Sequence, residues 1–83
     1  MKKYLDIIEG LEGELEEIKD RYESLSGLDR LKVRYVEKEL QRAREFLKHH
    51  NRIDVFNIPL LGIHLRNAFI VIIQLKKSLG ISS

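Results

Sequence analysis

The sequence contains no cysteine and no tryptophan, and it has a single proline. Without cysteine the chain can form neither a disulfide nor a thiolate metal site, which suits a reducing compartment. A chain of 83 residues buries a smaller share of its surface than larger domains do, so packing or oligomerisation must complete its core. We therefore expect one domain, residues 1–83, that pairs with a second copy.

The sequence also lacks a segment that could cross a membrane. The most apolar stretch, residues 60–75, holds 16 residues and includes His64, Arg66 and Asn67, whereas a spanning helix needs about 20 mostly apolar residues. The first eight residues contain two lysines but no apolar run of signal-peptide length. We expect a cytoplasmic protein that does not bind membranes.

Apolar residues recur at alternating steps of four and three over the first third of the chain. They are Tyr4, Ile8, Leu11, Leu15, Ile18, Tyr22 and Leu25. This spacing predicts a helix over about 3–25 that packs lengthwise against a partner. Ser26 and Asp29 have the spacing of a helix N-terminal cap, and Gly27 alternatively suits the position after a helix C-terminus. Either interpretation predicts a tight turn and an antiparallel helical hairpin.

The second predicted helix, about 27–50, carries two apolar stripes. The first consists of Val33, Val36, Leu40, Ala43, Leu47 and His50. The second consists of Leu28, Leu31, Tyr35 and Phe46, and it lies roughly 100–200° around the helix. This helix should therefore contact at least two neighbours. A linker at 51–57 follows it.

The third predicted helix, about 58–79, begins near Pro59 and ends before Gly80. Its first apolar stripe consists of Leu61, Leu65, Ala68, Ile72, Leu75 and Leu79. Ile63, Ile70 and Ile73 form a separate stripe, and 13 of the 22 residues are apolar. Because a helix that is apolar all round is normally buried all round, we expect the second stripe to form a dimer interface.

Two polar residues lie in or beside that second stripe. Arg66 lies within it and Asn67 near its edge, so they are predicted to belong to the interface and to set its register. Alternatively, Arg66 extends its guanidinium to solvent. The fold predicted from the three helices is an all-α, antiparallel three-helix bundle unit of long helices with coiled-coil spacing, completed by homodimerisation into a larger helical bundle.

The charges are unevenly distributed. Residues 1–27 contain eight acids and four bases, whereas residues 28–52 contain four acids and eight bases. This distribution predicts attraction between the first two helices. Five bases fall within about 80° on the second helix, where they could contact phosphates: Arg30, Arg34, Lys38, Lys48 and Arg52. Glu37 and Glu45 interrupt this group, so a solvated or salt-bridged face is the alternative.

No group of residues has the spacing of a metal or cofactor site. The adjacent His49 and His50 point about 100° apart on a helix, and His64 has no histidine or carboxylate at i+4 to complete a chelating pair. The five glycines are scattered, so no phosphate-binding loop is predicted. We expect no metal, cofactor or small-molecule substrate.

Arg44 and His49 have an Arg-x4-His spacing that resembles the ribonuclease motif of HEPN domains, which are helical and dimerise so that two such motifs face each other. The resemblance covers six residues. Glu45 stands where that family often has another polar residue, and HEPN domains are usually longer. We therefore assign no family, although a HEPN-like ribonuclease is the enzyme that the sequence resembles most.

The sequence predicts a non-enzymatic interaction or scaffolding module, an adaptor that acts as a homo-oligomer and binds another protein. The alternative is an accessory or regulatory protein that binds nucleic acid through the basic face of the second helix.

Overall fold

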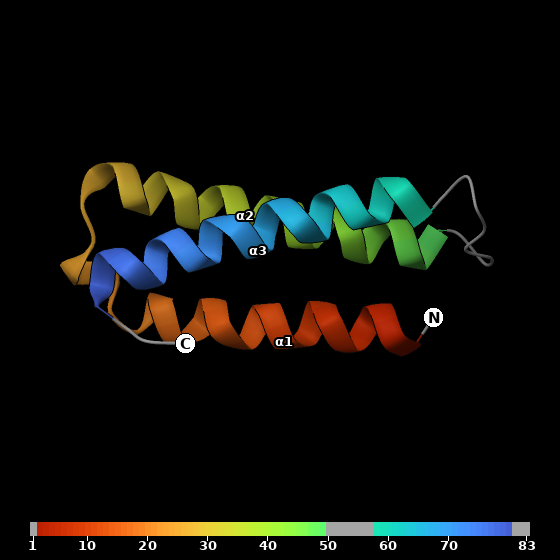
Figure 1. The fold of residues 1–83 in the computed structure, drawn as a ribbon, viewed down its shortest axis with the longest axis horizontal. Coiled ribbons are helices and arrows are strands. Elements are labelled where there is room, and N and C mark those ends of the chain that lie inside the picture. The colour runs from red at the N-terminus through yellow and green to blue at the C-terminus, as the bar shows by residue number, and fades with distance from the viewer. Residues whose placement is uncertain (1, 50–57, 81–83) are drawn as a thin grey trace.

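The computed structural model describes residues 2–49 and 58–80. These residues form three long helices, α1 (Lys2–Lys19), α2 (Gly27–His49) and α3 (Ile58–Leu79), with a short 3-10 helix, η1 (Tyr22–Ser24), between α1 and α2. Figure 1 shows α1 and α2 running in opposite directions, with α3 crossing in front of α2. The bundle is elongated, with extents of 41 × 20 × 16 Å. The predicted all-helical bundle is confirmed.

The core forms where the first apolar stripe of each helix meets the other two. It contains Ile8, Leu11, Leu15 and Ile18 of α1, Leu25 of the turn, Val33, Val36, Leu40 and Ala43 of α2, and Leu61, Leu65, Ala68, Ile72 and Leu75 of α3. Tyr4, Leu47 and Leu79 pack partly buried at its margins, whereas Tyr22 is exposed. The 3/4 spacing therefore identified the core correctly in all three helices. His50 and the predicted linker 51–57, with Arg52, lie outside the described residues.

The predicted capping residues explain where α2 begins and where α3 ends. The backbone N–H of Asp29 donates to the Ser26 hydroxyl oxygen over 3.1 Å, which makes Ser26 the N-terminal cap of α2. Gly27 is consequently the first residue of α2, and its φ is not positive. Gly80 follows α3 with a φ of 72°, the left-handed conformation that suits glycine after a helix.

The first helix is shorter than its apolar spacing predicts. An α-helix over 3–25 is wrong, because α1 ends at Lys19 and the chain tightens into η1. There the backbone N–H groups of Ser24 and Leu25 donate to the carbonyls three residues earlier, over 2.9 and 3.0 Å. The tighter winding turns the chain toward α2 and still buries Leu25.

Two polar contacts fix α3 against its neighbours. The Nδ1 of His64 lies 2.7 Å from Glu39 Oε2 of α2, where a protonated Nδ1 donates to the carboxylate, and the other Glu39 oxygen accepts from Arg42 over 3.2 Å. Glu39 is only 4% exposed, so these partners compensate a buried carboxylate. On the other side, Lys76 donates to Glu14 of α1 over 3.1 Å. Together these contacts fix the position of α3 along the lengths of α1 and α2.

Gly13 tests whether the outer side of α1 is open to solvent. A Cβ built on Gly13, within α1, has nothing within 4 Å, so Gly13→Ala should raise the free energy of unfolding by about 1 kcal/mol through helix propensity. The control is Gly80→Ala, which also meets open space but must adopt a positive φ and should lower stability by roughly 1 kcal/mol. Urea unfolding at one protein concentration measures both. A destabilised Gly13→Ala protein would contradict the open environment.

Candidate interaction surfaces

The outer face of α3 leaves large apolar side chains uncovered. Leu60 and Ile63 are each 53% exposed and Ile70 is 40% exposed, whereas Ile73 is partly buried. Arg66 is exposed among them, and Asn67 is half-buried. In Figure 1 α3 lies in front of α2, with α1 below both. The predicted second stripe therefore exists as an exposed face of the single chain.

Phe69 on α3 is 50% exposed, and its place in the sequence did not predict this exposure. It belongs to neither apolar stripe of α3, and it precedes Lys76, which contacts α1, by one heptad. The only signal available in the sequence was the apolar composition of α3.

The second apolar stripe of α2 is also largely uncovered. Leu28 is 65% exposed, Leu31 62% and Tyr35 41%, whereas Phe46 packs partly buried against the core. We name Leu28, Leu31 and Tyr35 the α2 patch. α2 contacts both other helices, as predicted, but neither helix covers this patch.

The α2 patch lies on the side of α2 that borders α3. Tyr35 precedes Glu39 by one helical turn, and Glu39 contacts His64 of α3. Leu31 and Leu28 precede Tyr35 by four and seven residues, so they continue the same stripe. The uncovered residues of α2 and α3 therefore adjoin each other.

The basic residues of α2 fall into two groups. Arg30 folds back onto the turn: its guanidinium lies 4.8 Å from the ring centroid of Tyr22, and it donates to the Glu23 carbonyl over 3.4 Å. Arg34, Lys38 and Lys48 are exposed, and the part of the chain that the structure describes offers them no hydrogen-bond or ion-pair partner. Arg52 lies outside the described residues.

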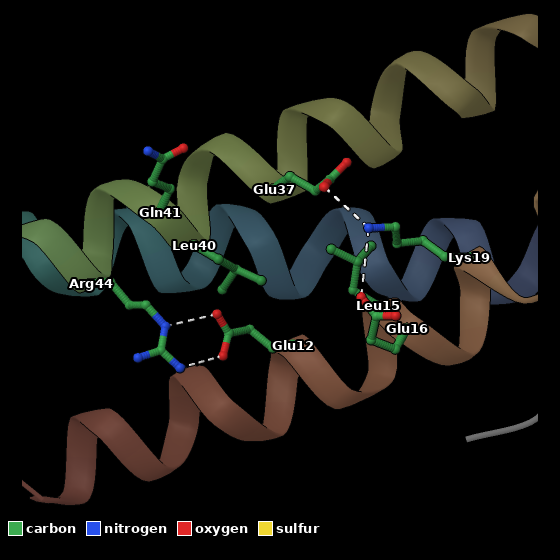
Figure 2. A pocket seen from close by; sticks show the side chains of 8 residues that line it. All are labelled: Glu12, Leu15, Glu16, Lys19, Glu37, Leu40, Gln41 and Arg44. Atoms are coloured by element: carbon green, nitrogen blue, oxygen red, sulfur yellow. Dashed lines mark hydrogen bonds and ion pairs between the residues drawn. The ribbon is translucent and has the colours of Figure 1, made fainter.

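A groove of about 440 Å³ runs between α1 and α2, with α3 behind it (Figure 2). Leu15 and Leu40 form its floor, and charged residues form its walls. Arg44 donates to both oxygens of Glu12 over 2.6 and 2.8 Å, and Lys19 donates to Glu37 over 3.2 Å. The predicted attraction between acidic α1 and basic α2 thus holds at Glu12 and Arg44 but is reversed at Lys19 and Glu37.

These ion pairs shift the pKa values of their members. The hydrogen bond from Arg44 lowers the pKa of Glu12 below its ordinary value of 4.5, although partial burial opposes the shift. The same contact raises the pKa of Arg44. The hydrogen bond to Glu37, with the attraction of its charge, raises the pKa of Lys19 above 10.5. Each shift stabilises the charged form that holds α1 against α2.

The described residues contain no group of three histidine or acidic side chains that could hold a metal ion. Arg44, the arginine of the Arg-x4-His pair, is engaged by Glu12, and His49 is exposed at the end of α2. None of the helices in the described ranges is long and apolar enough to cross a membrane.

Comparison of the chain with protein-family models, with curated proteins and with solved structures finds no match.

The lowered pKa of Glu12 predicts how stability depends on pH. A carboxyl whose pKa is lower in the folded state contributes stability above its unfolded pKa, and this contribution is lost as the pH falls through the folded value. Because both partners are over one-third exposed, wild type should exceed Glu12→Gln by only about 0.2–1 kcal/mol at pH 7. Urea unfolding between pH 3 and pH 7 should show this difference shrinking below pH 4.5.

The control for this experiment is Glu17→Gln on the exposed side of α1, where the described residues provide no ion-pair partner. It should not reproduce the pH-dependent difference. A wild type whose advantage over Glu12→Gln persisted unchanged at pH 3 would contradict the role of the Glu12–Arg44 pair.

Proposed function

We propose that this protein is a non-enzymatic helical interaction module, a scaffold or adaptor that acts as a homodimer and binds another protein. The observation that carries the proposal is the uncovered apolar face of α3, with Leu60, Ile63 and Ile70 at its centre. Large contiguous apolar patches on soluble proteins commonly mark a surface that contacts a partner. Arg66, Asn67 and Ile73 complete the proposed interface.

The opposite side of the bundle supports this choice of face. The groove between α1 and α2 is crossed by the Glu12–Arg44 and Lys19–Glu37 ion pairs (Figure 2), so its charged groups already have partners within the chain. An apolar helix that packed into this groove would either break the two ion pairs or remove them from water. A partner that docks on the outer side of α3 meets apolar surface without disturbing these ion pairs.

Ile70→Glu tests the proposed dimer. An unpaired charge buried between two copies costs several kcal/mol, so the variant should sediment as a monomer at concentrations where wild type is a dimer. Gln41→Glu adds the same charge on the groove side and should leave the dimer intact. Leu40→Ala removes a core side chain and should lower stability by about 2–5 kcal/mol without selectively breaking the dimer.

The wild type supplies an independent measurement in case Ile70→Glu fails to fold. If only the folded dimer is stable, the unfolding temperature should rise with protein concentration. A well-folded monomer at high micromolar concentration, with an unfolding temperature independent of concentration, would disprove the proposed dimer.

Nucleic-acid binding through α2 remains the second candidate, because Arg34 and Lys38 are exposed and unpaired within the described residues. Binding of this kind should weaken steeply as salt rises and should be lost when both are changed to Glu, with helicity retained. We expect no micromolar binding to duplex or single-stranded DNA or RNA at physiological salt in a mobility-shift assay. Such binding, abolished in the double variant, would favour the second candidate.

A further inference from the structure

The α2 patch and the outer face of α3 adjoin each other, yet both are exposed and no residue in the described ranges 2–49 and 58–80 covers them. They share a level along the bundle as well as a side. Glu39 and His64 mark one level, and α2 and α3 run in opposite directions. Ile70 lies six residues after His64 on α3, and Val33 lies six residues before Glu39 on α2, so Ile70 and Val33 lie at the same level. Val33 is midway between Leu31 and Tyr35 in the sequence.

We propose that the second copy docks antiparallel on the combined α2–α3 face, with the two-fold axis passing at the level of Ile70. Ile70 then meets Ile70 of the second copy, and Leu31 meets Tyr35 of the second copy, twice by symmetry. This inference rests on the proposed self-association. It goes beyond it by assigning the α2 patch to the interface and by fixing orientation and register.

The apolar area favours this wider interface. Full burial of a Leu or Ile side chain removes roughly 60–120 Å² of apolar surface, and of an aromatic one about 150–250 Å². Scaled by their exposed fractions, Leu60, Ile63 and Ile70 offer about 90–175 Å², and the α2 patch adds about 140–250 Å². A standard interface needs about 800 Å² per partner, of which roughly 450 Å² is apolar. The face of α3 alone supplies less than half of that, and both helices together approach it.

The position of Arg66 favours the same register. It precedes Ile70 by four residues, about 6 Å along α3. A two-fold axis at Ile70 therefore separates the two Arg66 residues by about 12 Å, more than the Debye length of about 8 Å at physiological salt. An axis at Arg66 itself would bring the two cations together and would place Leu31 at the level of Ala43 of the second copy, next to the charged Arg42. A parallel pair would also bring the two Arg66 residues to the same level.

Like charges nevertheless flank this face. Arg34 lies beside Leu31 and near the level of Ile70, with no partner in the described part of the chain. Docking brings the two copies of Arg34 toward each other at the exposed margin, where salt screens their repulsion. Self-association should therefore tighten when salt is raised from low to high concentration. Weaker association at high salt would indicate attraction between acidic and basic faces and would overturn the proposed docking.

Because the native chain has no cysteine, single cysteine variants report the geometry without background. A disulfide requires Cα atoms within about 7 Å, which is met only at facing positions. Under oxidised glutathione, Ile70→Cys should form a covalent dimer on a non-reducing gel, whereas Ile63→Cys and Arg66→Cys should not. A mixture of Leu31→Cys and Tyr35→Cys chains should form a linked pair.

The other outcomes separate this inference from the proposed function. Linkage of Arg66→Cys but not Ile70→Cys would overturn the register, and linkage of both Ile63→Cys and Ile70→Cys would indicate a parallel pair. A Leu31→Cys and Tyr35→Cys mixture that does not link would remove the α2 patch from the interface. In each case wild type that still sediments as a dimer upholds the proposed function, whereas monomeric wild type overturns both.

Discussion

The structure depends on one constraint: α3 carries apolar residues around most of its circumference, but the described part of the chain supplies only two other long helices to cover it. The stripe from Leu61 to Leu75 fills the space that α1 and α2 enclose, and every buried residue of that stripe belongs to the core. The remaining apolar residues must face outward. The exposure of Ile63 and Ile70 is thus a geometric consequence of packing three helices in a triangle, in which each helix has one side turned away from the other two.

The polar contacts between helices explain why each helix keeps a fixed rotation about its own axis. Glu39 and His64 join α2 to α3, Glu14 and Lys76 join α1 to α3, and Glu12 and Arg44 join α1 to α2. The Glu39 carboxylate is buried, so rotating α2 to cover its own patch would leave that charge without His64. The contacts therefore hold the helices in the rotation that exposes Leu31 and Tyr35.

The sequence predicted the three helices, the core stripes and the Ser26 cap, because a 3/4 spacing and a hydroxyl at the N-cap act locally. It could not predict the end of α1, since Tyr22 and Leu25 keep the same spacing in an α-helix and in a 3-10 turn. It identified the apolar α2 residues but not their exposure, which depends on helix rotation. Glu39 gave no signal, because a buried acid is recognisable only once its partner on another helix is known.

The coexistence of apolar and basic residues on α2 bears on what can bind there. Arg34 and Lys38 taken alone suit a phosphate backbone, to which such cations contribute attraction that salt weakens. A phosphate backbone bound at these cations would, however, leave the exposed Leu31 next to charged oxygens and would not bury its side chain in apolar contacts. A protein surface can satisfy both kinds of group, because interfaces place apolar residues at the centre and charged residues at the rim. On α2 the exposed Leu31 has Arg34 and Lys38 at its margin, an organisation that supports the proposed protein partner over a phosphate backbone.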